Sequence, residues 1–311
     1  MKKVCFSIPC YNEQDNVEPI TEAIMSLFEE KYSGIYDCII EYIDNCSTDT
    51  TRALLEKLCA EYPYNVKAIF NSRNFGGVSS FYGLLQTEGD CSIVLPCDFQ
   101  VPISVIEDLL KKWEEGADIV CAVKKGSKEN GLMWSIREKY YQIIQKYSEI
   151  SQIEHFTGAG LYDKKVVCWL KTLDDPIPSL RGMVAEYGAN IQNVLYLEEK
   201  RKKGKSKHNF SSLFSVALKN IIIYTDLIPN FAFYTGLVLF IGGGIFGLIG
   251  LIIKICNWGT FTNILYPLIF ALIMLFGIQF LFMGLMGRYL SLIHKRIIKR
   301  PLVIEEKRLN F

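Results

Sequence analysis

A short apolar run at residues 94–97 ends on one carboxylate, Asp98, and the carboxamide of Gln100 follows two places later. Oxygen ligands of this kind suit a hard cation, because Mg²⁺ is often bound by one or two carboxylates together with substrate phosphates and water. Asp98 could instead be an ordinary acid at the end of a strand. The choice between a metal ligand and a strand-end acid depends on the residues that the fold brings to Asp98.

Three more polar clusters follow apolar runs earlier in the chain, at residues 9–13, 44–49 and 71–77. In the second cluster, Asp44 stands where an apolar run ends, and its carboxylate can accept hydrogen bonds from a ligand. Asp49 lies in the first turn of the helix predicted next, where a carboxylate interacts favourably with the helix dipole. We therefore expect Asp44 to bind a ligand and Asp49 to cap a helix.

Alternating patterns in the N-terminal part of the chain indicate the elements that would position these clusters. β-Branched and apolar runs predict strands at residues 4–8, 38–43, 66–70, 92–95 and 118–123. Apolar residues at helical spacing predict helices within residues 13–32, 48–62, 77–89 and 103–116. This alternation predicts the α/β class, with a mostly parallel sheet covered by helices on both faces. Ligands bind beyond the carboxyl ends of the strands in such sheets, so the four polar clusters should form one site.

The chain changes character after about residue 210, where charges become rare. Residues 227–253 and 255–287 carry no charged side chain, and about 20 apolar residues suffice for a helix to cross a bilayer. We predict two transmembrane helices, at about 231–253 and 265–286, rather than a buried hairpin of a soluble protein. Lysine and arginine are dense before the first segment and after the second, which places both termini in the cytosol.

The predicted organisation has four parts. A cytosolic α/β domain occupies residues 1–209, and residues 210–228 form a juxtamembrane helix that lies along the membrane surface or packs on the soluble domain. The two transmembrane helices occupy residues 229–290, and a basic cytosolic tail occupies residues 291–311. The sequence therefore predicts a multi-pass protein of the cytoplasmic (inner) membrane.

The composition argues against several classes of protein. The formal net charge is +1, which gives no general reason to expect nucleic acid as a partner. The ten cysteines form no C-x-x-C pair, and the three histidines join no cluster at zinc spacing. The cysteines therefore indicate a reducing compartment rather than a disulfide framework. The apolar run near the N-terminus is too short for a signal peptide.

Four motifs occur in order along the predicted edge of the sheet: SIPCYNE at residues 7–13, YIDNCSTDTT at 42–51, NSRNFGG at 71–77, and the stretch that ends in Asp98 and Gln100. With a later RKKGKSK motif, the two apolar segments and the basic end of the chain, nearly the whole sequence resembles the family-2 glycosyltransferases of the GT-A fold. The resemblance is to the group that transfers sugars to polyprenyl phosphates, which includes dolichol-phosphate mannose synthases and bacterial undecaprenyl-phosphate glucosyltransferases. It implies a GT-A fold for residues 1–209.

The resemblance implies a donor site and a metal site on this edge. The positions that match the family's nucleotide-sugar pocket are Pro9, Tyr11, Glu13, Asp44, Asn45, Asn74 and Gly76. Asp98 and Gln100 would bind Mg²⁺ or Mn²⁺, although the family commonly has D-x-D-x-Q here and Pro96 replaces the first acid. The family also usually has an acid where this chain has Asn45. Because Pro96 replaces one of the family's two acids, we expect the metal to bind more weakly, but we still expect it to bind.

The resemblance also implies a cluster of cations around two phosphate groups. The family pattern R-x-x-G-x-S-K supplies Arg201, Lys205, Ser206 and Lys207. Its cations would act in catalysis by stabilising charge on the leaving diphosphate, whereas the alternative is a solvated basic loop. The residues expected near the acceptor phosphate are Arg137, Gly158, Arg181 and Ser206.

The glycine-rich loop at residues 156–165 bears on the choice of acceptor, because many relatives carry an acid where this chain has Gly158. A neutral hydroxyl acceptor needs a general base. A phosphate monoester is already ionised at neutral pH, since its second pKa is about 6. Gly158 therefore favours a phosphate acceptor, and Glu186 is the best remaining acid if a base is needed.

The sequence thus predicts an inverting glycosyltransferase that moves one sugar from a nucleotide-diphosphate sugar to undecaprenyl phosphate or another polyprenyl phosphate. UDP-glucose is the first expectation for the donor, UDP-N-acetylglucosamine the second and GDP-mannose the third. The lipid-linked sugar would serve the modification of cell-surface polysaccharide, with a flippase and a second copy of the chain as candidate partners. Two alternatives are a glycolipid transferase that acts on a diacylglycerol-type hydroxyl and a catalytically degenerate membrane scaffold.

Overall fold

The computed structural model describes residues 1–126, residues 153–198 without 174, 176, 177 and 189, residues 301–311, and isolated positions between 234 and 297. The chain forms two compact units. The first comprises Met1–Gln145, Ile150–His208 and Lys299–Phe311, and the second comprises Lys146–Glu149 and Asn209–Ile298. The predicted helices at 210–228 and 231–253 lie outside the described residues apart from position 234, and only scattered positions of the predicted helix at 265–286 are described. Within the described residues, no helix combines the length and the apolar character that spanning a membrane requires.

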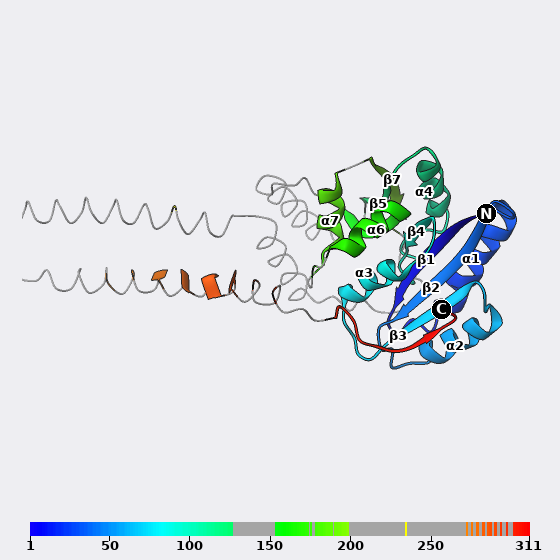
Figure 1. The fold of residues 1–311 in the computed structure, drawn as a ribbon, viewed down its shortest axis with the longest axis horizontal. Coiled ribbons are helices and arrows are strands. Elements are labelled where there is room, and N and C mark those ends of the chain that lie inside the picture. Colours follow the sequence, from blue (N-terminus) through cyan, green and yellow to red (C-terminus); the bar gives the residue numbers. More distant parts are fainter. Residues whose placement is uncertain are drawn as a thin grey trace, which may run out of the picture. The chain divides into compact units, whose positions relative to one another are not determined.

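The described residues of the first unit form an eight-stranded sheet in the order β7-β5-β6-β4-β1-β2-β3-β8 (Figure 1). The strands are β1 (Lys2–Cys10), β2 (Tyr36–Asp44), β3 (Val66–Asn71), β4 (Cys91–Val94), β5 (Ile119–Gly126), β6 (Phe156–Asp163), β7 (Ile191–Leu197) and β8 (Glu305–Leu309). Strands β6 and β8 run opposite to the others. The predicted α/β class with a mostly parallel sheet is confirmed, and the five predicted strands correspond to β1 to β5.

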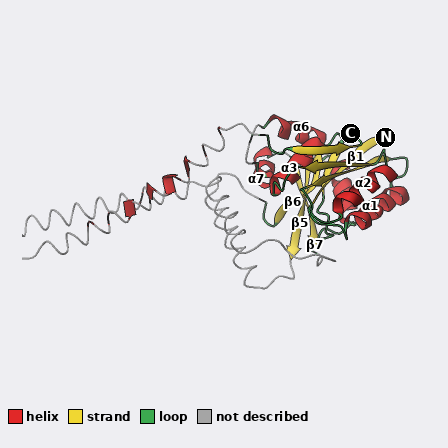
Figure 2. Ribbon diagram, turned by 90° about the horizontal axis from the view of Figure 1, so that it is seen from below, coloured by secondary structure: helices red, strands yellow, loops and turns green. Residues whose placement is uncertain are grey.

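Helices cover both faces of the sheet (Figure 2). They are α1 (Val17–Lys31), α2 (Thr51–Glu61), α3 (Gly77–Gln86), α4 (Val105–Glu114), α6 (Lys164–Thr172) and α7 (Leu180–Tyr187). One apolar core lies between the sheet and α1, α2 and α4, and a second lies between the sheet and α3, α6 and α7. The alternation of side chains along a strand supplies both cores: Phe6 and Ile8 belong to the first, whereas Ser7 faces α3. The four predicted helices are confirmed as α1 to α4.

The glycine-rich segment that the sequence predicts as a loop is instead strand β6. This strand lies between β4 and β5 and pairs with both in antiparallel fashion. Gly160 allows this arrangement, because a Cβ atom there would lie 2.4 Å from the carbonyl oxygen of Val120 on β5. Glycines weaken the local pattern of a strand and often mark a close approach of two backbones. Gly160 therefore weakens the strand pattern in the sequence, and it also allows β6 to lie against β5 in the fold.

Strands β7 and β8 lie at the two ends of the sheet, and the sequence patterns predict neither. β8 belongs to residues 291–311, which the sequence assigns to a basic tail, and it pairs antiparallel with β3. Its five residues, EEKRL, carry four charges, so no apolar alternation marks them as a strand. The pairing with β3 therefore has to be read from the tertiary structure.

One acid, Glu41 on β2, is buried within the sheet. Its side chain is 1% exposed, and neither of its carboxylate oxygens accepts a hydrogen bond. Lys67 Nζ on β3 lies 3.8 Å from Glu41 Oε1, which is too far for a hydrogen bond. Burial raises the pKa of Glu41 to about 7, and attraction to Lys67 offsets only part of that effect.

Replacing Glu41 with glutamine should remove a pH dependence of stability. The folded protein keeps the Glu41 proton to about pH 7, whereas the unfolded chain releases it near pH 4.5. The wild-type protein therefore loses stability as the pH rises through this window, and the Glu41→Gln variant does not. The two proteins should unfold at similar temperatures near pH 4.5. At about pH 8 the variant should be more stable by up to ~3 kcal/mol, since one pKa unit corresponds to about 1.4 kcal/mol. Thermal unfolding followed by circular dichroism measures the difference, and equal midpoints at the higher pH contradict the prediction.

Candidate active site

The four polar clusters meet at one edge of the sheet, as the sequence predicts. They follow β1, β2, β3 and β4, whose parallel pairing brings the carboxyl ends together. The N–H of Asn12 donates to Ser47 Oγ at 2.8 Å, and Asn12 Oδ1 accepts from the N–H of Thr48 at 2.8 Å, which joins the first two clusters. Asn45 Nδ2 donates to Asn74 Oδ1 at 3.0 Å and so joins the second cluster to the third. The fourth cluster follows β4, the other neighbour of β1.

The loop after β1 holds the first residues predicted for the nucleotide pocket. Pro9 and Tyr11 are partly exposed at the edge of the sheet. The N–H of Glu13 donates to Thr51 Oγ1 at 2.9 Å, and its carboxylate accepts from Asn16 Nδ2 at 2.6 Å. Glu13 therefore helps to shape the loop that carries Pro9 and Tyr11.

Asp44 ends β2 and is fully buried. Both of its carboxylate oxygens accept from the N–H of Ser47 at 3.2 Å, and Oδ2 also accepts from Arg52 Nε at 3.1 Å. Burial raises the pKa of Asp44 above the usual value of an aspartate, and the bonds from Ser47 and Arg52 oppose that rise. The structure thus holds a buried carboxylate, partnered by one cation, directly beneath the edge.

Asn45 orders the loop that leads into α3. Its Nδ2 donates to Asn74 Oδ1 at 3.0 Å and to the carbonyl of Gly76 at 3.3 Å, and its Oδ1 accepts from the N–H of Phe75 at 2.8 Å. A carboxylate could accept but could not donate these bonds. The amide at this position therefore shapes the loop that carries Asn74 and Gly76, which are both predicted donor-site residues.

Asp98 lies in a tight turn directly after β4 and is 5% exposed. Its Oδ1 accepts from the N–H of Gln100 at 3.2 Å, and Phe99 between them adopts a φ of 58°. Tyr196 on β7 lies close enough for the Asp98 charge to add to the effect of burial in raising the tyrosine pKa, and Tyr196 is hydrogen-bonded to Thr157. Neither Tyr196 nor Thr157 can be found from the sequence patterns, because both belong to strands that those patterns do not predict.

The residues predicted for the acceptor side lie on β6 and α7. Gly158 is buried near the start of β6 with a φ of 98°, and its carbonyl accepts from the hydroxyl of Tyr162 at 2.7 Å. Because β6 runs antiparallel to β4, its first residues lie at the edge that carries Asp98. Arg181 is partly exposed in the first turn of α7, and Glu186 is exposed near the end of the same helix.

The N-terminal half of the chain matches a known family over these elements. Residues 5–167 match the family described as glycosyl transferase family 2, and this range contains most of β1, the whole of β2 to β6 and all four polar clusters. The chain belongs to glycosyl transferase family 2. The resemblance predicted from the motifs is confirmed, and the protein is a glycosyltransferase.

Relatives of this transferase align with nearly its whole length. The prophage bactoprenol glucosyl transferase homolog of Escherichia coli (strain K12) is 29% identical over 96% of this chain and 97% of the relative. The bactoprenol glucosyl transferase of Shigella phage SfII is 27% identical over 98% of each chain. Among solved structures, glucosyl-3-phosphoglycerate synthase from Mycobacterium tuberculosis in complex with Mn²⁺, UDP and phosphoglyceric acid is 16% identical. It covers 71% of this chain and 76% of that chain, with a TM-score of 0.46.

The side chains after β4 fit a divalent cation that takes most of its ligands from a substrate. Asp98 supplies a carboxylate and Gln100 a carboxamide, both from one turn, and oxygen donors of this type suit Mg²⁺ or Mn²⁺. Pro96 supplies no ligand. Within the described part of the transferase, no three His, Cys, Asp or Glu residues gather into a metal-binding group, so the diphosphate and water would have to complete the coordination.

Five of the predicted residues lie outside the described residues: Arg137, Arg201, Lys205, Ser206 and Lys207. The described chain stops at Gly126, at the end of β5, and at Glu198, just beyond β7. Both strands run parallel to β1, so both points lie at the edge that carries Asp98. Glu198 precedes Arg201 by three residues. The role of the basic loop remains a prediction.

Two other charged residues at this edge have partners within the fold. Lys124 on β5 forms an ion pair with Glu198. Asp49 Oδ1 accepts from the N–H of Thr51 at 3.0 Å, directly before α2. Asp49 therefore stabilises the turn that leads into α2, whose N-cap residue is Thr50.

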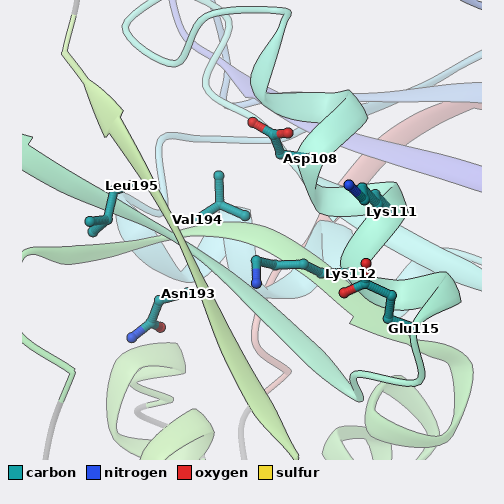
Figure 3. Close-up of a pocket in the computed structure, with 7 residues that line it drawn as sticks. All are labelled: Asp108, Lys111, Lys112, Glu115, Asn193, Val194 and Leu195. Atoms are coloured by element: carbon teal, nitrogen blue, oxygen red, sulfur yellow. The ribbon is translucent and has the colours of Figure 1, made fainter.

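A polar cavity of about 290 Å³ lies between α4 and β7 (Figure 3). Its walls are Asp108, Lys111, Lys112 and Glu115 of α4 and Asn193, Val194 and Leu195 of β7. Its lysines and acids are equal in number, so it offers no net charge to an anionic ligand. No residue predicted for the donor, the metal or the acceptor lines this cavity.

Proposed function

We propose that this transferase moves one sugar from a nucleotide-diphosphate sugar to undecaprenyl phosphate or a similar polyprenyl phosphate, with inversion at the anomeric carbon. The observation that carries the proposal is the alignment with relatives named bactoprenol glucosyl transferase, which extends well beyond the family-2 domain to 96–98% of this chain. UDP-glucose is the first candidate for the donor, and UDP-N-acetylglucosamine is the second. The product would be a lipid-linked sugar for the modification of cell-surface polysaccharide.

The donor would bind at the edge where the first three polar clusters meet. Asp44 lies at the end of β2 and would accept a hydrogen bond from an N–H of the base. Tyr11, on the loop after β1, would flank the base. The loop shaped by Asn45 would place Asn74 and Gly76 against the rest of the donor. These contacts would leave the anomeric carbon directed toward the turn that holds Asp98.

Asp98 and Gln100 would hold Mg²⁺ or Mn²⁺ against the donor diphosphate. When bound, the cation neutralises part of the diphosphate charge. Arg201, Lys205 and Lys207 would stabilise the charge that develops on the leaving diphosphate. An acceptor phosphate oxygen would form a bond to the anomeric carbon from the face opposite the diphosphate, as the bond to the diphosphate oxygen breaks.

The acceptor phosphate would need no general base. It is ionised at neutral pH, so no proton has to leave it before the attack. This accounts for glycine at position 158, where many relatives carry an acid. Gly158 is buried beside the edge, and it would let the acceptor approach the backbone of β6 without a carboxylate to repel it.

The transferase would act at the cytoplasmic membrane, where its lipid acceptor lies. The charge-free segments at residues 231–253 and 265–286 would cross the bilayer, and the lysines and arginines that flank them would keep the catalytic domain and both termini in the cytosol. A flippase would then turn the lipid-linked sugar over. A homo-oligomer is a further candidate assembly.

Transfer to the lipid tests the proposal directly. The full-length protein in detergent would receive undecaprenyl phosphate, Mg²⁺ and one radiolabelled nucleotide sugar from a panel of UDP-glucose, UDP-N-acetylglucosamine and GDP-mannose. We expect label from one donor in the organic phase, in an anomeric configuration opposite to that of the donor. Label that enters diacylglycerol instead would identify a glycolipid transferase. Absence of both transfer and UDP binding would identify a degenerate scaffold.

A further inference from the structure

The C-terminal strand β8 carries a bulge beside the donor site. Ala68, Ile69 and Phe70 of β3 pair in sequence with Leu309, Arg308 and Lys307, but the next residue, Asn71, pairs with Glu305. Glu306 therefore has no counterpart on β3. A bulge of this kind re-aims side chains and is common next to functional sites. Figure 1 shows β8 in red beside β3, at the end of the sheet that carries α2.

The bulge turns two consecutive side chains toward one helix. In a regular strand, neighbours point to opposite faces of the sheet. Here Glu306 accepts from Arg52 Nη2 at 2.7 Å, and Lys307 Nζ donates to Glu56 Oε1 at 2.9 Å. Arg52 and Glu56 are four residues apart on α2 and so lie on the same face of that helix. The strand is thus tied to α2 by two ion pairs of similar length.

Of these two ion pairs, the one between Glu306 and Arg52 is connected to the proposed donor site, because Arg52 also contacts Asp44. Arg52 donates from Nη2 to Glu306 and from Nε to Asp44 Oδ2 at 3.1 Å. Its guanidinium also lies over the ring of Phe70, 5.3 Å from the ring centroid. A guanidinium is planar and presents its donors in a fixed fork, so a carboxylate that fixes one arm also directs the other. Glu306 thereby directs Arg52 Nε at the buried carboxylate of Asp44.

We propose that strand β8 completes the donor site, and that Glu306 and Arg52 are positioning residues that hold Asp44 for the nucleotide base. This inference rests on the proposed function, in which Asp44 accepts a base N–H. Arg52 bonds to Oδ2, and the other bonds to this buried carboxylate come from Ser47, so Arg52 and Ser47 together fix its position. Glu306 is separated from Arg52 by 254 residues, a stretch that includes both predicted transmembrane helices. Donor affinity would therefore depend on docking of the chain that follows them.

Binding of UDP to the full-length protein tests this proposal. We expect Glu306→Ala to raise the Kd for UDP, measured calorimetrically with Mg²⁺, by ~3- to 10-fold, the range of coupling seen between neighbouring groups. The matched control is Lys307→Ala, which removes the other ion pair between β8 and α2 but leaves Arg52 untouched. It should change the Kd by less than about twofold. Equal effects of the two variants would overturn the proposal, because they would show that only attachment of the strand matters.

A double variant separates positioning from a merely structural role. Arg52→Lys keeps the positive charge beside Asp44 but cannot bridge two carboxylates in the same way. If Glu306 acts through Arg52, removing Glu306 should have little further effect once Arg52 is lysine. The Kd for UDP of the double variant, Arg52→Lys with Glu306→Ala, should then lie within about twofold of the Kd of Arg52→Lys alone. If the two substitutions instead raised the Kd independently, so that their factors multiplied in the double variant, the proposal would be wrong. In the transfer assay, Glu306→Ala should raise KM for the donor and leave kcat within about twofold.

Asp44→Asn, measured in parallel, distinguishes failure of this proposal from failure of the proposed function. If Asp44→Asn weakens UDP binding and Glu306→Ala does not, Asp44 keeps its role and the positioning proposal is wrong. If Asp44→Asn binds UDP as the wild-type protein does, the donor-site role of Asp44 fails and the positioning proposal fails with it. Thermal midpoints of every variant would show that each one is folded.

Discussion

Asp98→Asn should lower the rate of sugar transfer by about 10³-fold and leave the protein folded. Asparagine has nearly the same shape, and its side-chain oxygen can still accept from the N–H of Gln100, the bond that closes the turn. The variant lacks the negative charge that a divalent cation needs. The substitution also keeps the volume of this buried side chain, so the fold should persist. The assay is transfer of label to undecaprenyl phosphate, together with the Mg²⁺ dependence of UDP binding.

Asp49→Asn is the matched control for Asp98→Asn. Asp49 lies at the same edge, and its carboxylate accepts from the N–H of Thr51 before α2. The side-chain oxygen of asparagine can accept the same hydrogen bond in this turn, so both activity and stability should persist. If Asp98→Asn kept more than about a tenth of the wild-type rate, a smaller loss than removal of a charge-stabilising group causes, Asp98 would be an ordinary strand-end acid. The proposed metal site would then be wrong.

Gly160→Ala should destabilise the catalytic domain by about 3–5 kcal/mol. Its new Cβ would lie 2.4 Å from the carbonyl oxygen of Val120 and 3.2 Å from Cys121 Cα, both on β5. Backbone cannot move aside as the end of a flexible side chain can, so β5 and β6 would have to separate in the interior of the sheet. Thermal unfolding should show a midpoint lower by roughly 10 °C or more, or the protein should fail to fold.

Gly116→Ala is the control that separates steric clash from backbone strain. Gly116 has a φ of 98° in a turn after α4, and no atom lies within 4 Å of the Cβ that alanine would add. Alanine there should cost only the strain of a left-handed conformation, about 1 kcal/mol. If the two variants lost equal stability, the close approach of β5 and β6 would not be the reason for glycine at position 160.

The sequence by itself determined the elements that carry the predicted active site. Helices α1 to α4 follow from apolar residues at helical spacing, because each helix buries one face. Strands β1 to β5 follow from short β-branched and apolar runs, because helices cover both faces of the sheet. The strand-end rule for parallel sheets then brings Asp44 and Asp98 to one edge, and the structure has both there. The motifs also sufficed to identify the family.

The tertiary structure alone decided how these residues are held. β6 reads as a glycine-rich loop, because glycine weakens the strand pattern, whereas the fold requires glycine at position 160 for the close approach to the backbone of β5. β8 carries no apolar pattern, because it is held by pairing with β3 and by ion pairs to α2. The series Asp44, Arg52 and Glu306 joins residues more than 250 positions apart. Local sequence patterns report what a segment buries, whereas contacts of this kind depend on which distant segment the fold brings alongside.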